Sequence, residues 1–138
     1  MNTFKSLIKL SKQNVDEKRR LVTEAEEGVH FYKSALTAHT RRHETSLETA
    51  RNNLNVRANF QAFLQKSKLT QDNLQLHLNS AIFTLAEKRK DLQIAFEELK
   101  KYEKAYENQL AREKAEQDRK EQAFADEIGL QGFRRKKR

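Results

Sequence analysis

Apolar side chains recur at every seventh position in two separate parts of the chain. Two ladders follow this spacing: Ile8, Val15, Val22, Val29 and Leu36, and then Leu78, Leu85, Leu92, Leu99 and Tyr106. A repeat of seven keeps one side chain per two helical turns on the same stripe of a helix, and each stripe needs a partner to leave water. The segment between the ladders is short, so one chain can fold back on itself. The pattern predicts an all-α protein in which two long helices form an antiparallel coiled-coil hairpin.

The predicted helices are bounded by loss of the repeat. The first runs from about residue 3, where Thr3 can act as an N-cap, to about residue 64. The stretch 65–72 gathers Ser, Thr and Asp side chains, which compete for backbone hydrogen bonds, and we place the turn there. The second helix runs from about 72 to 125. We expect residues 1–138 to form a single coiled-coil hairpin that ends in an apolar and basic tail at 126–138.

Two details of the seam between the helices follow from the pattern. After Leu36 the first ladder meets His43, and apolar residues resume four positions late at Leu47, which predicts a stutter in the coiled coil. In the second helix, larger apolar residues alternate with the ladder and are expected to form the other half of the seam. These are Ile82, Phe96 and Leu110.

Composition favours long uninterrupted helices. Charged residues make up 35% of the chain, which has no proline, three glycines and no cysteine, so disulfides and thiolate metal sites are excluded. No apolar run exceeds three residues, which argues against a membrane-spanning helix and a signal-peptide core. The net charge is +8, and the five terminal residues 134–138 are all basic.

Catalytic patterns are absent from the sequence. His39 and His43 share a helical face at a spacing that can hold zinc, but no third ligand is near and Arg41 and Arg42 would repel a cation. A histidine pair that lines the seam or faces water is the better interpretation. The sequence contains no phosphate-binding glycine loop and no catalytic triad pattern. We expect no enzyme activity, no cofactor and no metal site.

The aromatic residues Phe60 and Phe63 lie beside the predicted turn, where the seam ends. Exposed aromatic side chains at the tip of a hairpin are candidate anchors for a protein partner. The alternative is a hydrophobic plug that closes the hairpin, and the sequence does not separate the two.

The C-terminal segment combines apolar and basic residues beyond the last ladder position. Its candidate binding residues are Ile128, Leu130, Phe133, Arg134 and Arg135. A terminal run of charge is often only a solvated end, but contiguous basic residues also bind phosphates or acidic lipid. The interleaved apolar residues favour a docking segment, and nucleic-acid binding is the weaker alternative.

Several short motifs give the chain a resemblance to a known family. They are Asp16–Arg20 (DEKRR) after a basic, leucine-rich start, Lys101–Lys104 (KYEK), Arg119–Gln122 (RKEQ) and Asp126-Glu127 before the basic end. In this order, and over nearly the whole chain, they resemble the FliJ family, the coiled-coil component of the flagellar type III export apparatus.

The resemblance implies a non-enzymatic stalk. Family members form an antiparallel two-helix coiled coil similar to the rotor shaft of rotary ATPases, with the terminal end in the pore of the hexameric export ATPase. The region near the turn meets the membrane export gate. Residues 59–64 resemble the segment that docks on the gate, and Phe63 matches its phenylalanine, whereas Ser67 and Thr70 stand where the family has apolar residues.

The resemblance also implies a cellular location and partners. Two other functions remain as alternatives. We expect a cytoplasmic protein peripherally associated with the export apparatus at the inner membrane, with the ATPase hexamer and the gate as partners; secretion chaperones are further candidates. The alternative is a basic coiled coil that binds RNA or the ribosome through residues 134–138. A third interpretation is a peripheral membrane tether.

Overall fold

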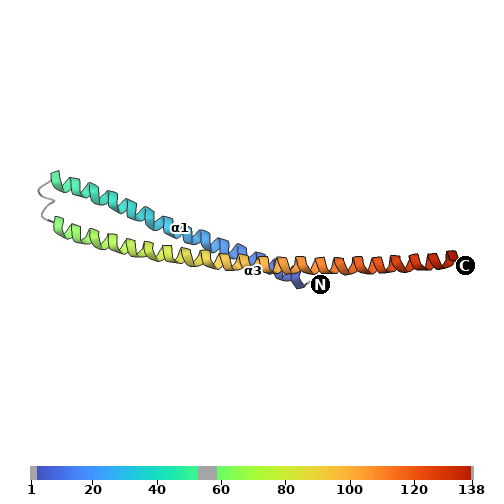
Figure 1. The fold of residues 1–138 in the computed structure, drawn as a ribbon. Helices are drawn as coiled ribbons and strands as arrows, with labels where there is room; N and C mark the ends of the chain where they lie inside the picture. The colour runs from blue at the N-terminus through green and yellow to red at the C-terminus, as the bar shows by residue number, and fades with distance from the viewer. Residues whose placement is uncertain (1–2, 53–58, 138) are drawn as a thin grey trace. The chain divides into compact units, whose positions relative to one another are not determined.

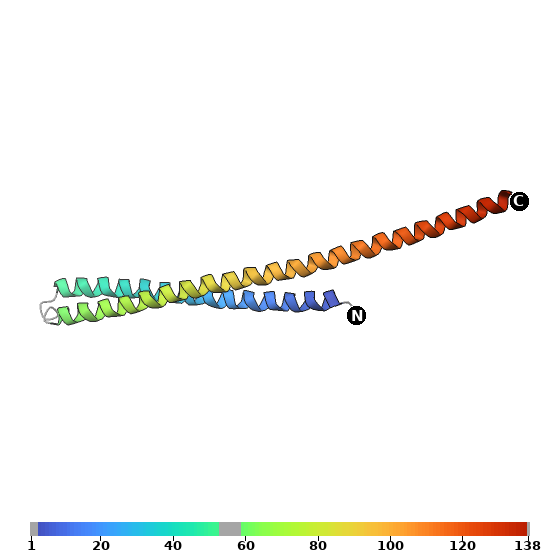
Figure 2. The same ribbon diagram turned by 60° about the horizontal axis from the view of Figure 1, so that its bottom comes forward.

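The fold consists of two long α-helices that run in opposite directions. The structure, a computed structural model, describes residues 3–52 and 59–137. Helix α1 spans Thr3–Asn52 and helix α3 spans Phe60–Lys137. The two helices lie side by side in both views (Figures 1 and 2). The predicted all-α antiparallel coiled-coil hairpin is confirmed.

The turn lies earlier in the chain than the sequence predicted. Helix α3 begins at Phe60, and the Phe63 amide donates its first helical hydrogen bond to the Asn59 carbonyl at 3.1 Å. The predicted turn at 65–72 and the predicted extension of the first helix to residue 64 are therefore wrong. Polar residues of this stretch fit a helix because they find hydrogen-bond partners there: the Thr70 hydroxyl donates to the Lys66 carbonyl at 3.1 Å, and the Ser67 hydroxyl bonds His43 of α1 at 2.7 Å.

The helices divide between two structural units, and the first comprises Asn14–Ala95. At its centre, Val22 and Val29 of α1 pack with Leu78 and Leu85 of α3, each at most 9% exposed. Further apolar residues pack around this cluster: Ala25, Tyr32, Leu36, Ala81 and Leu92. The two seven-residue ladders therefore do meet in a common seam, as the sequence predicted.

The other half of the α3 seam differs from the prediction by one position. Ile82 and Leu110 are each 46% exposed, and Ala81 and Ala95 take the inward positions expected for Ile82 and Phe96. Small residues at these positions allow the helices to pack closely, and the larger apolar side chains beside them stay at the flanks. Side-chain size therefore misled the sequence interpretation.

The first ladder continues through His43 without interruption. His39 and His43 are half-buried, and Ala50, seven residues after His43, is only 4% exposed. The positions 36, 43 and 50 thus keep the repeat of seven, so the predicted stutter is wrong. Polar side chains occupy the seam where apolar ones were expected.

The second unit combines the start of α1, up to Gln13, with α3 from Phe96 onward. Here Ser11 and Leu99 are each 8% exposed, and Tyr102 and Tyr106 are half-buried. Helix α3 continues past the start of α1, as the red end of the ribbon shows (Figure 2). Every residue from Leu110 to Arg135 is exposed. The expected separate tail at 126–138 instead continues α3 through Lys137.

Local side-chain pairs support this exposed part of α3. The Gln109 amide donates to Glu113, Gln117 to Glu121 and Gln122 to Asp126, each across one helical turn. The Lys120 ammonium also lies 3.8 Å from the Glu116 carboxylate. Pairs spaced four residues apart stabilise a solvated helix by about 0.2–0.5 kcal/mol each, so these contacts add a small stabilisation to the exposed part of α3.

Candidate partner-binding surfaces

The aromatic residues at the start of α3 contact both each other and α1. The rings of Phe60 and Phe63 stack with centroids 6.3 Å apart, and Phe63 stacks on the His43 imidazole at 5.8 Å. Both phenylalanines are half-buried, and they line a shallow groove with Ser46 and Thr49 of α1. Both rings therefore help to close the hairpin, and both also line a groove at the surface.

A polar cluster lies next to this aromatic pair. The His39 Nε2 group donates to the Ser67 carbonyl at 3.0 Å, and the His43 Nδ1 atom shares a 2.7 Å hydrogen bond with the Ser67 hydroxyl. Ser67 is 6% exposed, so its polar atoms need these partners. The pair lines the seam, and the residues that the structure describes contain no group of three metal-ligating side chains.

Ser67 and Thr70 mark the positions where the chain departs from the resemblance. Ser67 faces inward and bonds both histidines, whereas Thr70 is exposed and bonds its own helix. Both nevertheless line a groove with Phe63 and Lys66. The surface beside Phe63 is therefore more polar than it would be with the apolar residues that the resemblance leads one to expect at these two positions.

The candidate residues at the C-terminal end lie on the exposed part of α3. Ile128, Leu130 and Phe133 are 52%, 59% and 57% exposed, and Arg134 and Arg135 are also exposed. Phe124, 65% exposed, belongs with them and was missed as a site residue. Because α3 has about 3.6 residues per turn, the nine steps from Phe124 to Phe133 make about two and a half turns. The apolar groups therefore lie on opposite sides of the helix.

The charged motif near the start of α1 forms a local ion-pair network. Arg20 binds Glu17 through its Nη2 and Nε atoms at 2.6 and 3.2 Å, and also binds Glu24. The hydrogen bond with Arg20 lowers the pKa of the Glu17 carboxyl and raises the pKa of Arg20. All three side chains are more than half exposed, so water screens the pairs and they add little to stability.

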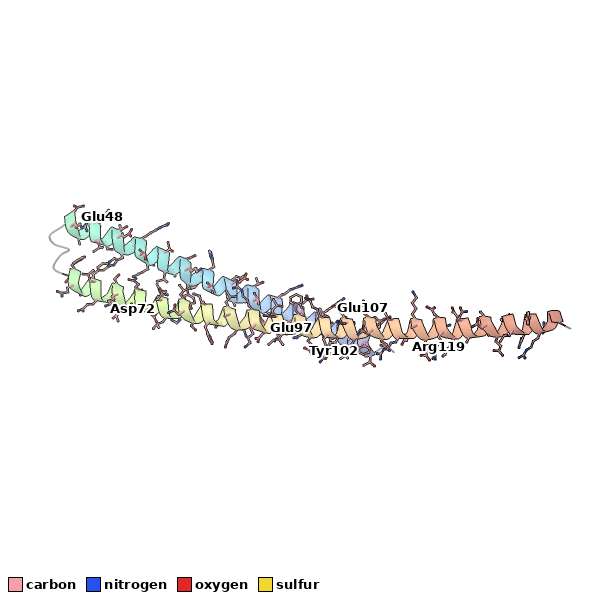
Figure 3. All side chains as sticks on the ribbon, in the orientation of Figure 1. Glu48, Asp72, Glu97, Tyr102, Glu107 and Arg119 are labelled. Carbon is pink, nitrogen blue, oxygen red and sulfur yellow. The ribbon has the colours of Figure 1, made fainter. Side chains whose placement is uncertain are left out.

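A similar local contact occurs in the second charged motif. The Tyr102 hydroxyl donates to Glu98 at 3.2 Å, and this hydrogen bond raises the pKa of the phenol. Both residues lie on α3, where Figure 3 labels Tyr102. The contacts of both motifs are therefore local hydrogen bonds and ion pairs on an exposed helix surface.

Another aromatic contact was not anticipated from the sequence. Tyr32 of α1 stacks on His77 of α3 with ring centroids 5.3 Å apart and planes only 9° from parallel. Gly28 lies one turn before Tyr32 in the same groove, and a Cβ atom at Gly28 would meet nothing within 4 Å. The helices therefore do not approach each other closely at Gly28. Seven-residue spacing could have found Tyr32, because it follows Ala25 in the seam.

The described helices define a class of protein: a long two-helix coiled coil with surface grooves and no catalytic constellation among the residues seen. The family described as "Flagellar FliJ protein" matches residues 1–138, the entire chain, and the protein belongs to this FliJ family. No curated protein and no solved structure is significantly similar to the chain. The resemblance drawn from the charged motifs is confirmed.

Family membership gives the protein a role related to flagellar export. The family is a structural and non-catalytic one, which agrees with the expectation drawn from the sequence. Over residues 3–52 and 59–137, neither helix offers a stretch with the length and hydropathy needed to cross a bilayer.

Proposed function

We propose that this protein is the stalk of the flagellar type III export apparatus, coupling the export ATPase ring to the membrane export gate. The observation that carries the proposal is the extension of α3 beyond its partner helix as an exposed helix with apolar residues on opposite sides. A helix with apolar residues on opposite sides suits an enclosing surface rather than a single flat one. The lumen of a hexameric ring is such a surface.

The other candidate surface lies at the beginning of the same helix. Phe60 and Phe63 occupy the first turn of α3, and Ile128 and Phe133 its last turns, with no break between them. A continuous helix resists bending and stretching, so it can link a partner at one end to a partner at the other. The protein then acts in the cytoplasm, held at the inner membrane by these partners, and secretion chaperones have the exposed helix faces available to them.

The ATPase contact is tested by removing the apolar end. Truncation after Glu127 should abolish stimulation of the export ATPase, because it removes Ile128, Leu130 and Phe133, which supply most of the affinity at about 25 cal/mol per Å² buried. The matched control keeps these residues and replaces the basic residues 134–138 by glutamine. That control should slow association and reduce its salt dependence but preserve full stimulation at saturation.

The same two variants separate the stalk from the RNA-binding alternative. Normal ATPase stimulation by the truncated protein would contradict the stalk assignment of this end. If neutralising residues 134–138 abolishes RNA binding while ATPase stimulation is unchanged in both variants, the protein is an RNA-binding coiled coil. RNA binding through these charges would weaken steeply with salt, since phosphate contacts release counterions.

A further inference from the structure

The side of α3 that faces away from α1 carries an apolar stripe. Leu69, Leu76 and Phe83 are 70%, 68% and 65% exposed, and they follow one another at intervals of seven residues. The buried residues Leu78 and Leu85 come two positions after Leu76 and Phe83, which places the exposed residues on the outer side of the helix. A seven-residue repeat on an outer face is the pattern that a further helix would bury.

The surroundings of this stripe are nearly free of charge. In a chain with 35% charged residues, Asp72 is the only Asp, Glu, Lys or Arg between Leu69 and Ala86. Figure 3 labels Asp72 on α3. The positions beside the stripe carry amides and a hydroxyl instead, namely Asn73, Asn79 and Ser80, all exposed. The outer face of α1 differs, because its first half carries the exposed ion pairs of Arg20 with Glu17 and Glu24.

We propose that the outer face of α3 from Lys66 to Glu87 binds a second copy of this chain, with the two helices antiparallel and a two-fold axis at Leu76. This arrangement places Leu76 against Leu76 and Leu69 against Phe83 of the other copy, since opposed residue numbers then sum to about 152. All three apolar residues leave water in both copies. The contact is isologous, as in most homodimers.

The flanking residues are complementary in this register. In an antiparallel pair with two-fold symmetry, each flank of the stripe meets the same flank of the other copy. Lys66 then lies opposite Glu87, and because the symmetry repeats every contact, two opposite-charge pairs form. From Lys66 to Glu87 the formal charges cancel, since Lys66 and Lys68 balance Asp72 and Glu87.

The polar residues near the centre match in the same way. Asn73 meets Ser80 on the flank of Lys66, and Asp72 meets Asn79 on the other flank, so each polar group gains a partner of suitable chemistry. Asn79 already accepts a hydrogen bond from Gln75 at 3.0 Å through its oxygen, which leaves its amide N–H groups free to donate to Asp72. A parallel pairing would instead bring opposite flanks together and hold Lys66 and Glu87 about 30 Å apart along the helices, so neither opposite-charge pair could form. The antiparallel register is therefore the one that the charges favour.

The small apolar area makes the association weak. Three apolar side chains per copy fall at the low end of specific interfaces, which bury at least about 1,200 Å² in total. Sedimentation of the full chain from low micromolar to millimolar concentration should show a reversible monomer–dimer equilibrium. Leu76→Glu should raise the dimer dissociation constant about tenfold or more, because both copies place the charge at the axis. Ile94→Glu is the matched control, since Ile94 is an exposed apolar residue of α3 outside the stripe.

A charge exchange tests the register. Lys66→Glu alone and Glu87→Lys alone should each raise the dissociation constant roughly fivefold, and the double variant should restore it. Neither side chain is buried, so helicity and melting temperature should stay unchanged in all three. Failure of the double variant to restore dimerisation would overturn the proposed register.

Single cysteines give a direct test, because the chain has none of its own. Leu76→Cys should link two copies by a disulfide much faster than Ile94→Cys. Leu69→Cys should link slowly, because antiparallel copies hold these residues about 20 Å apart. Fast linking through Leu69→Cys would indicate a parallel pair and overturn the proposal. A protein that stays monomeric at millimolar concentration, with Leu76→Glu weakening its binding to the export ATPase or gate, would assign the stripe to another protein and also overturn it.

Discussion

The imidazole of His43 lies flat against the ring of Phe63, with centroids 5.8 Å apart and planes 14° from parallel. This contact joins the late part of α1 to the first turn of α3. Phe63 therefore has two roles in the proposal: it fixes the end of the hairpin and offers part of its ring to a partner. A variant of Phe63 changes both unless the experiment separates them.

Phe63→Ala should weaken binding to the export gate about tenfold or more and reduce swimming motility, since aromatic anchors dominate small interfaces. It should also lower the free energy of unfolding by about 1–2 kcal/mol, because a half-buried ring is lost. Calorimetric titration at a temperature where both proteins are folded measures the first effect, and thermal melting the second.

Phe63→Leu is the control, because leucine keeps an apolar side chain over His43 and should retain most of the stability. If Phe63→Ala alters melting but leaves gate binding and motility unchanged, the aromatic pair is a plug and the gate-docking role is wrong.

Leu85→Asp should disrupt the hairpin. Leu85 is 9% exposed within the cluster of Val22, Val29 and Leu78, and an unpaired buried charge costs several kcal/mol. Circular dichroism should show large losses of helicity and melting temperature. Ile94→Asp, at an exposed site of the same helix, should change neither by much. Equal behaviour of the two variants would mean that the ladder is not the seam.

Gly28→Ala should stabilise the hairpin by about 1 kcal/mol, the usual difference between these residues inside a helix. The backbone of Gly28 has no positive φ, and an added Cβ would meet nothing within 4 Å, so the gain carries no steric penalty. Chemical denaturation should show a higher midpoint. Ser34→Ala, at an exposed site further along α1, is the control and shows how much a change of helix propensity alone alters the stability. If Gly28→Ala is less stable than the parent, a Cβ atom at this position does not fit without a clash.

Ser67→Ala should lower the free energy of unfolding by about 1–2 kcal/mol, because the hydroxyl shared with His39 and His43 is lost in a buried place. Ser80→Ala, on an exposed part of α3, should leave it within about 0.5 kcal/mol of the parent. Denaturant titrations of the two variants under the same conditions provide the comparison. Indistinguishable midpoints would mean that the histidines are satisfied without Ser67.

Ala123→Pro tests whether the lone part of α3 must be helical. Proline inside a helix removes a hydrogen bond and costs about 3 kcal/mol, so residues beyond it should lose helicity while the hairpin melts as before. ATPase stimulation should fall although Ile128 and Phe133 are still present. Ala123→Ser is the control at the same site; full stimulation by the proline variant would show that the apolar residues act without helical order.

The sequence sufficed for the ladders because they are apolar, regular and long, and Val22, Val29, Leu78 and Leu85 occupy the core as predicted. It failed where inward residues are small or polar. Ala81 and Ala95 lie in the seam while the larger Ile82 does not, and Ser67 and His43 stabilise each other across the helices. The periodicity of one helix cannot predict the contact between Ser67 and His43, because it joins two helices. The turn was misplaced because polar side chains in 65–72 also find partners when the stretch is helical: Thr70 bonds its own helix, and Ser67 bonds the histidines of α1.

The candidate surfaces were predicted less completely than the fold. The exposure of Ile128, Leu130 and Phe133 follows from the end of the ladder, and the sequence indicated it. The half-burial of Phe60 and Phe63 could not be read from the pattern, because it depends on where the chain turns and on the position of His43 across the seam.

The uneven seam has a consequence for how the hairpin opens. Between Val22 and Leu85 the contacts are apolar, whereas toward the turn they pass to His39, His43 and Ser67, whose hydrogen bonds can be exchanged for water at small cost. Fluctuations that separate α1 from α3 should therefore begin beside Phe63 and stop at Val29 and Val22. Backbone amide hydrogen exchange should be graded along unit 14–95, fastest near the aromatic pair and slowest in the middle. A partner that binds Phe63 can thus separate the helices locally beside it, while the apolar centre of the hairpin stays closed.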